Sequence, residues 1–215
     1  MSNSILDELD RVVLESFKNQ RPEQVLINFY SDLWTSLKRR ACTSTNFTGI
    51  SEYLFYRAIA FKLEKALIEK FEPKQFTKDT YYLESKTIIL TRDLDLQKIN
   101  TILPKMRPDI ALFQKGESQA RLVAAFELKL YISNRHILSD LLERLKKLTT
   151  FPDVLLFPIL SQVQYKKEVN RFCNDHPKRS FVITNEEGAF ELQVTLLEAL
   201  QAIIRNLQGN QEVKL

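Results

Sequence analysis

Charged residues interrupt two otherwise apolar segments, and this feature constrains the fold of the chain more than any other. The first segment is Met106-Arg107-Pro108-Asp109-Ile110-Ala111-Leu112-Phe113, and the second is Val123-Ala124-Ala125-Phe126-Glu127-Leu128-Lys129-Leu130-Tyr131. Both are typical of strands in a buried sheet. An isolated ionised carboxylate or ammonium group is costly to bury. We therefore expect Asp109, Glu127 and Lys129 to pair with one another or to bind a cation.

The spacing of these residues favours a shared cation site. Successive side chains of a strand alternate between faces, so Glu127 and Lys129 lie on one face and their apolar neighbours on the other. The polar turn 114–119 contains a glycine and is typical of an antiparallel hairpin. Closing that hairpin brings Asp109 beside Glu127. Two carboxylates and a backbone carbonyl are hard oxygen ligands that suit Mg²⁺.

At these residues the chain resembles the PD-(D/E)xK nuclease superfamily, which has the restriction-endonuclease-like fold. Pro108-Asp109 matches the first half of the superfamily motif, and Glu127-Leu128-Lys129 matches the second half. The resemblance implies an α/β protein with an αβββαβ core and a mixed central sheet. In that core a helix precedes three antiparallel strands that carry the site, and a helix and a further strand follow.

The resemblance also implies a chemistry. Asp109, Glu127 and the backbone carbonyl of Leu128 would hold Mg²⁺, for which Mn²⁺ can substitute, and Lys129 would stabilise negative charge or orient the attacking water. The implied activity is that of a hydrolase acting on phosphodiester bonds in nucleic acid, specifically a DNA endonuclease that leaves a 5′-phosphate and a 3′-hydroxyl. The structural alternative is a hairpin in which Glu127 and Lys129 form an ordinary edge ion pair.

In this superfamily a carboxylate from the first core helix often joins the metal site, and the predicted helix 49–71 offers two. At about 100° per residue, Glu52 falls within the apolar stripe that must face the sheet, whereas Glu64 falls at its margin, toward Arg57. We expect Glu52 to complete the site or help bind a second ion; the alternative is that it only favours the helix N-terminus electrostatically. The stripe consists of Phe55, Tyr56, Ile59, Leu63, Ala66 and Leu67.

Glycines, prolines and hydrophobic periodicity divide the chain into elements. At 215 residues it is expected to be a single domain, with an N-terminal helical addition over 1–45, a core over 46–215 and a closing C-terminal helix. The predicted helices are 5–19, 22–40, 49–71, 133–149, 162–175 and 195–208. The predicted strands are 80–90, 108–114, 121–131, 153–160, 179–185 and 189–194.

The charge balance is compatible with a polyanionic partner. The net charge is +4 and the pI is about 9.0, a mild excess that is far below that of a chain built to coat nucleic acid. Lys166, Lys167 and Arg171 on one helix, with Lys178 and Arg179 just beyond it, are the candidate nucleic-acid contacts. The alternative is that they form a solvated helix face.

Other features exclude several classes of protein. Cys42 and Cys173 are too few and too far apart for a zinc site or a disulfide scaffold, and both are expected to stay reduced in the cytoplasm. His136 and His176 have no metal-ligand neighbour at a diagnostic spacing. Because no stretch approaches the roughly 20 apolar residues of a membrane span, we expect a soluble, cytoplasmic protein without a membrane partner.

Two alternatives from other functional classes stay open. One is a nuclease-like fold with weak or no catalysis that acts as a nucleic-acid-binding or protein-assembly module. The other is an α/β interaction protein whose apolar helices mediate oligomerisation, which predicts that Asp109, Glu127 and Lys129 are scattered or exposed. The sequence leaves open DNA versus RNA, end versus interior attack, the number of metal ions and whether a homodimer forms.

Overall fold

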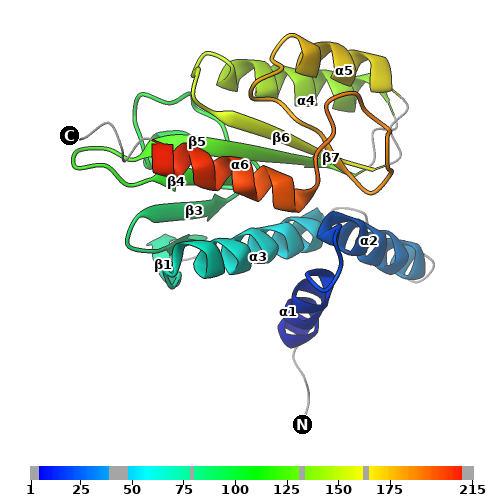
Figure 1. Ribbon diagram of the computed structural model, residues 1–215, viewed down its shortest axis with the longest axis horizontal. Coiled ribbons are helices and arrows are strands. Elements are labelled where there is room, and N and C mark those ends of the chain that lie inside the picture. The colour runs from blue at the N-terminus through cyan, green and yellow to red at the C-terminus, as the bar shows by residue number, and fades with distance from the viewer. Residues whose placement is uncertain (1–4, 39–47, 78–79, 131–133, 162–164, 210–215) are drawn as a thin grey trace.

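A mixed sheet of seven strands organises the computed structural model, with three helices before it, helices between its later strands and a helix after it (Figure 1). The structure describes residues 5–38, 48–77, 80–130, 134–161 and 165–209. The α-helices are α1 (Ile5–Ser16), α2 (Pro22–Lys38), α3 (Thr48–Leu67), α4 (Arg135–Leu148), α5 (Lys166–Asn174) and α6 (Leu196–Gly209). The strands are β1 (Glu72–Thr77), β2 (Thr80–Glu84), β3 (Ile88–Arg92), β4 (Ile110–Gln114), β5 (Arg121–Lys129), β6 (Leu155–Leu160) and β7 (Ile183–Thr184).

The strands lie side by side in the order in which they occur along the chain. Strands β1 to β5 pair antiparallel with their neighbours, whereas β5, β6 and β7 run parallel. Parallel neighbours need a crossover connection, which α4 supplies between β5 and β6, and α5 between β6 and β7. The expected α/β class, mixed sheet, N-terminal helices and closing helix are therefore confirmed.

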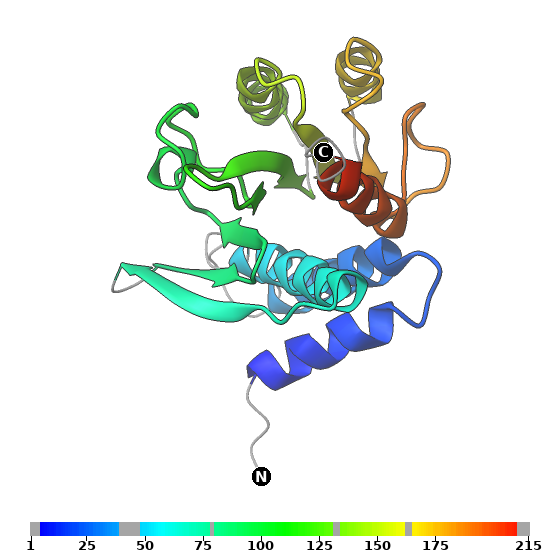
Figure 2. The same cartoon turned by 60° about the vertical axis from the view of Figure 1, so that its left-hand side comes forward.

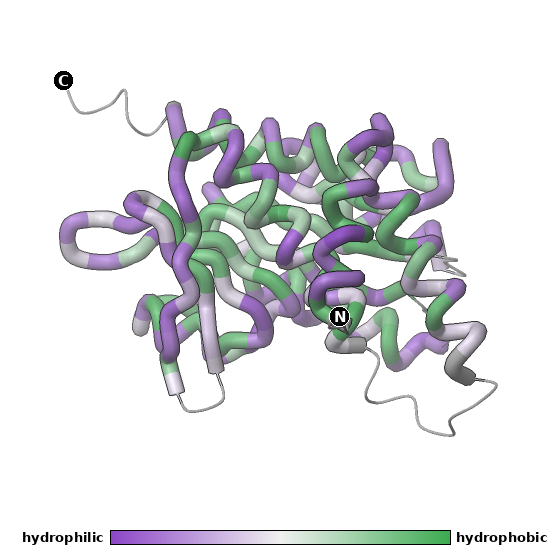
Figure 3. The backbone as a smooth tube through the Cα atoms, turned by 90° about the horizontal axis from the view of Figure 1, so that it is seen from below, coloured by the Kyte–Doolittle hydropathy of each residue, from purple (hydrophilic) through white to green (hydrophobic). Residues whose placement is uncertain are grey.

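Each face of the sheet is covered by its own set of helices (Figure 2). On one face α3 and α6 pack against apolar side chains of the strands, and α1 and α2 pack in turn on α3. Phe126 and Phe157 stack on this face with their ring centroids 5.0 Å apart. On the other face α4 and α5 cover a second cluster, in which Leu141 and Leu145 are fully buried. Hydrophobic segments accordingly gather in the sheet (Figure 3).

The region after α3 differs from the prediction. The predicted strand 80–90 is two strands, β2 and β3, joined by a turn that the carboxylate of Glu69 holds by accepting hydrogen bonds from Ser85 and from Thr87. The helix predicted over 49–71 ends earlier, and Ala66 within its predicted apolar stripe is exposed. The chain then continues into the unpredicted strand β1. All six β1 residues are exposed, so no hydrophobic alternation marks this edge strand.

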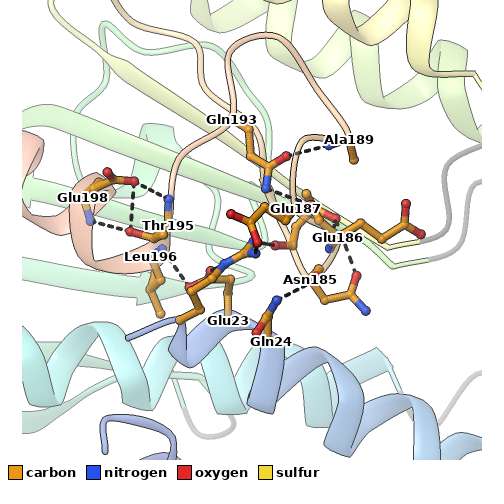
Figure 4. A network of polar contacts seen from close by, with 12 residues as sticks. Glu23, Gln24, Asn185, Glu186, Glu187, Ala189, Gln193, Thr195, Leu196 and Glu198 are labelled. Atoms are coloured by element: carbon orange, nitrogen blue, oxygen red, sulfur yellow. Dashed lines mark hydrogen bonds and ion pairs between the residues drawn. The ribbon is translucent and has the colours of Figure 1, made fainter. Parts of the chain in front are cut away.

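The strand pair predicted over 179–185 and 189–194 is also wrong. Only Ile183–Thr184 forms a strand, and the second segment contacts Val182, the residue before this strand, through a parallel bridge at Gln193. The side-chain amide of Gln193 accepts from the Ala189 N–H at 3.0 Å and donates to the Glu186 carbonyl at 2.8 Å (Figure 4). The Gln193 side chain thus forms the hydrogen bonds that these backbone groups would have made with a neighbouring strand in the predicted pair.

A buried carboxylate fixes the N-terminal helices to the core. Glu23 is fully buried at the start of α2 and accepts hydrogen bonds from Arg21 Nε and from the Leu196 N–H, each at 3.0 Å (Figure 4). Thr195 and Glu198 form a reciprocal capping box at the start of α6. The start of α2 and the start of α6 are therefore held together. Among the described helices, none is long and apolar enough to cross a membrane.

Candidate active site

Strands β4 and β5 bring the two halves of the predicted site together. Their register pairs Ile110 with Phe126 and Ala111 with Ala125, and continuing it by one residue places Asp109 opposite Glu127. Phe126 belongs to the core cluster beneath α3 and α6, whereas Glu127 faces α4. The predicted alternation along β5 and the predicted antiparallel hairpin are both confirmed. The interaction-protein alternative, which required scattered or exposed side chains, does not match this geometry.

Asp109 is held against the end of β5 by its side chain. Its Oδ2 atom accepts a hydrogen bond of 2.6 Å from the Leu128 N–H, and Lys129 Nζ lies 3.9 Å from the same oxygen. Only 15% of the Asp109 side chain is exposed. Burial raises the pKa of Asp109, and the nearby Lys129 ammonium group opposes that rise. The sequence assigned a role to the carbonyl of Leu128, and the structure adds one for its N–H, which orients Asp109.

Glu127 is the most unusual residue of the site, because it is fully buried without hydrogen bonds to its carboxylate. Neither of its side-chain oxygens has a hydrogen-bond partner among the described residues. Arg144 Nε lies 3.0 Å from Glu127 Oε2, so the two form an ion pair that lacks the alignment of a hydrogen bond. Burial, followed by repulsion from Asp109, raises the pKa of Glu127 to about 8. A buried carboxylate in this condition is energetically costly as it stands.

Helix α3 brings a third carboxylate toward the same place. Glu52, in the first turns of α3, is partly buried, and burial together with the repulsion of Asp109 raises its pKa to about 7. Lys129 also acts on Glu52, so Glu52 shares the electrostatic environment of Asp109 and Lys129. Glu64 has a different position: it accepts a hydrogen bond of 2.8 Å from the Phe71 N–H beyond the end of α3. Glu64 therefore serves the local chain fold.

The residues fit a hard divalent cation held by two carboxylates. No three His, Cys, Asp or Glu side chains in the described ranges are grouped closely enough to be a ready-made metal cluster. Mg²⁺, however, usually keeps several waters and takes one or two carboxylates from the protein. Asp109 and the unpartnered oxygens of Glu127 supply such a pair, and an added positive charge would relieve the burial of Glu127.

Sequence reasoning missed Arg144, which contacts Glu127 from α4. Its neighbours along the helix face, Leu141, Leu145 and Leu148, are fully buried, so Arg144 lies beside an apolar stripe. Other charged residues share this helix, so the sequence alone does not distinguish Arg144 from them.

Several other polar side chains have structural roles. Arg179 donates to the carbonyls of Phe151 and Thr149, both at 2.8 Å, so its guanidinium group holds the segment after α5 against the end of α4. His176 Nδ1 lies 2.9 Å from the Phe172 carbonyl. Asp95 caps a short 3₁₀ turn by accepting from the Gln97 N–H.

The predicted nucleic-acid contacts on α5 are only partly available. Lys166 forms an ion pair of 3.3 Å with Glu186, whereas Lys167 and Arg171 are exposed. Cys173 is buried and unpaired, and burial raises the pKa of its thiol. Cys42 lies outside the described residues.

Comparisons with known proteins return no match: no family model, no curated protein and no solved structure is significantly similar to the chain. The fold and the site together define an α/β protein. At one end of its mixed sheet, Asp109, Glu127 and Lys129 converge, with Arg144 against Glu127.

Proposed function

We propose that the protein is a metal-dependent nuclease, a phosphodiesterase that hydrolyses nucleic acid, with DNA as the proposed substrate and endonucleolytic cleavage as the proposed mode. The observation that carries the proposal is the fully buried carboxylate of Glu127 opposite Asp109, with Lys129 beside them; neither Glu127 oxygen accepts a hydrogen bond from the described residues. A purely structural ion pair would not leave both oxygens of a buried carboxylate without hydrogen bonds.

The order of elements supports the same proposal. Apart from the β1–β2 hairpin, which lies between α3 and β3, the elements α3, β3, β4, β5, α4 and β6 occur in the order of an αβββαβ unit, with β3 to β5 antiparallel and β6 parallel to β5. In this unit Asp109 directly precedes the second strand, and Glu127 and Lys129 lie at the end of the third. We therefore propose that the fold is restriction-endonuclease-like, with α1, α2 and the β1–β2 hairpin as additions.

Each residue has a role in the proposed chemistry. Asp109 and Glu127 would hold Mg²⁺ or Mn²⁺, and the carbonyl of Leu128 and the side chain of Glu52 would complete the oxygen set. The cation, when bound, supplies a polarised phosphoryl oxygen and a water of lowered pKa. Lys129 places a positive charge beside Asp109, where it stabilises the negative charge that develops on the phosphate during attack.

The first test is cleavage of linear, circular, branched and single-stranded DNA, and of RNA, with Mg²⁺, with Mn²⁺ and with a chelator. We expect cleavage that depends on the cation and falls at least about a hundredfold in Lys129→Ala. Lys146→Ala is the matched control, because Lys146 is an exposed lysine on α4. If no substrate is cut with either metal while binding persists without metal, the nuclease proposal is wrong.

The second candidate function is a nuclease-like module with weak or no catalysis that binds nucleic acid or assembles with protein. Two observations favour it: no metal cluster is preformed among the described residues, and Arg144 already neutralises Glu127 in part. Metal binding separates the candidates, since a module that uses Arg144 permanently would not take up a divalent cation.

The position of the basic residues gives a further prediction for binding. Lys105 and Arg107 are exposed on the loop that leads directly into Asp109, whereas Lys86 is exposed in the turn before β3, at the opposite end of the β3–β4 pair. Charge reversal at Arg107 should weaken DNA binding about tenfold and reduce its salt dependence, because phosphate contacts release counterions. Fluorescence anisotropy at two salt concentrations measures this. Lys86→Glu should change little, and Lys167→Glu shows whether α5 belongs to the binding surface; equal effects of all three substitutions would contradict a localised site.

A further inference from the structure

Helix α4 places one guanidinium group inside the candidate site. Asn134 caps the start of α4 by accepting a hydrogen bond of 3.0 Å from the Ile137 N–H, which fixes where the helix begins. Leu141 and Leu145 then anchor the helix on the sheet. Arg144 lies between these anchors along the helix, and 27% of its side chain is exposed. The helix therefore holds Arg144 at the boundary between the buried carboxylate and solvent.

Arg144 contacts both halves of the site. Its Nε atom is 3.0 Å from Glu127 Oε2, and its Nη2 atom donates a hydrogen bond to the carbonyl of Arg107, two residues before Asp109. The contact to Arg107 is a hydrogen bond, whereas the contact to Glu127 is a close ion pair that lacks the alignment of one. Among the described residues, Arg144 Nε and the two Glu127 oxygens have no other hydrogen-bond partner, so the ion pair leaves the buried carboxylate incompletely satisfied.

The charges at this place cannot all be satisfied by Arg144. Glu127 is fully buried beside a second carboxylate, Asp109; the Lys129 ammonium group lies 3.9 Å from Asp109, and Arg144 supplies a single positive charge at Glu127. Burying an ion pair is favourable only when additional hydrogen bonds satisfy the remaining atoms. A divalent cation at the same carboxylate oxygens would supply more charge and direct ligation, but it would be repelled by the guanidinium group. The cation and Arg144 therefore compete for Glu127.

We propose that Arg144 is the resident counter-ion of Glu127, that it gives up this carboxylate when a divalent cation binds, and that its guanidinium group then contacts the phosphate of the nucleic acid. This inference rests on the proposed nuclease function. A planar guanidinium group binds phosphate through paired N–H groups, and the exposed part of Arg144 already lies at the solvent side of the site. Arg144 would thus weaken metal binding in the free protein and strengthen substrate binding in the metal-loaded one.

The test measures Mn²⁺ binding without nucleic acid, by titration calorimetry or by loss of the free Mn²⁺ resonance signal. We expect Arg144→Gln to bind Mn²⁺ about tenfold more tightly than the parent protein, because a repelling charge has been removed. Arg144→Lys retains the charge and should bind Mn²⁺ nearly as the parent does. Arg135→Gln, an exposed arginine on the same helix, is the matched control.

Cleavage by the same variants gives the second readout. In Arg144→Gln and Arg144→Lys, kcat/KM on DNA should fall at least tenfold at saturating Mn²⁺, because the paired phosphate contact is lost. Opposite changes in metal affinity and activity support the proposal, since a purely structural role of Arg144 would weaken both. The melting temperature in chelator identifies any variant that fails to fold. If Arg144→Gln does not fold, the activity of Arg144→Lys is compared with that of the parent protein.

The outcomes separate this inference from the proposed function. If the parent protein binds Mn²⁺ and Arg144→Gln binds it equally or less tightly, the counter-ion proposal is overturned and the nuclease proposal stands. If neither protein binds Mn²⁺ at millimolar concentration, both proposals are overturned.

Discussion

Replacing Asp109 by asparagine is expected to reduce metal-dependent cleavage at least about a thousandfold, which corresponds to about 4 kcal/mol of lost transition-state stabilisation. Asp109 is one of the two carboxylates that face the proposed cation, and an amide is a poor substitute for a charged ligand. The amide oxygen of asparagine can still accept the hydrogen bond from the Leu128 N–H, so the end of β5 stays in place. Steady-state kcat/KM with Mg²⁺ and with Mn²⁺ measures the loss.

Thermal unfolding of the same variant distinguishes a catalytic role from a structural one. Asp109 is buried near Glu127, and crowded carboxylates repel each other, so Asp109→Asn should unfold at the same temperature as the parent protein or higher when no metal is added. Asp32→Asn, at an exposed position of α2, is the matched control. Parallel losses of activity and stability would instead identify Asp109 as a structural partner of Lys129.

The convergence of Asp109, Glu127 and Lys129 could be predicted from the sequence because it depends on two strong constraints. A strand that is apolar on both sides of a charge must turn that charge to one face, and a short polar turn must return the next strand beside it. Register then follows from the apolar pattern, since a slip of one residue would turn Glu127 and Lys129 into the apolar cluster in which Phe126 and Leu128 pack. The structure has this register, with Asp109 opposite Glu127.

The position of Glu52 could also be predicted, because helices have a regular periodicity. The sequence did not identify Arg144 as a site residue. Helical periodicity places Glu52 on the side of α3 that faces the sheet, and the structure brings it into the electrostatic environment of Asp109. Arg144 lies in a helix that carries many charges, Glu143, Lys146 and Lys147 among them, so that one more cation is inconspicuous in the sequence. Only the packing of α4 against β5 distinguishes it.

Strand β1 and the segment 189–194 failed prediction because neither is held by hydrophobic burial. The residues of β1 are exposed and are fixed by backbone pairing with β2, a long-range contact that leaves no pattern in the sequence. The segment 189–194 has strand-like residues, but the side chain of Gln193 satisfies its backbone. Hydrophobic patterns in a sequence indicate which residues are buried. These two segments depend on hydrogen bonds instead, so such patterns do not identify them.

Glu127→Gln is expected to stabilise the metal-free protein at alkaline pH, which is unusual for a substitution at a fully buried position. Burial raises the pKa of Glu127 in the folded protein to about 8, above the ordinary value of 4.5. Between these two values the folded protein binds more protons than the unfolded chain, so the free energy of unfolding falls as pH rises. The stability associated with the protonated carboxyl is present below about pH 4.5 and is lost as pH rises through about 8. Glutamine has no such dependence.

The size of the effect follows from the same shift. At about pH 8.5 in chelator, Glu127→Gln should be more stable than the parent protein by about 2 to 4 kcal/mol, and the difference should shrink toward about pH 5. Urea unfolding at three pH values measures it. Glu143→Gln, an exposed residue of α4, is the control and should change stability by less than about 0.5 kcal/mol at every pH.

Added metal should stabilise the parent protein more than Glu127→Gln. A cation that binds the ionised Glu127 removes the cost of burying its charge, so Mg²⁺ or Mn²⁺ should raise the unfolding temperature of the parent protein most at alkaline pH. Glu127→Gln should show little response, because an amide is a weak ligand for these ions. A variant that is less stable than the parent at all pH values, with an unchanged pH dependence, would mean that Arg144 compensates the charge of Glu127 completely, so that no cation is required. The pH dependence of stability thus tests whether the buried carboxylate at the centre of the site requires a cation that the protein itself does not supply.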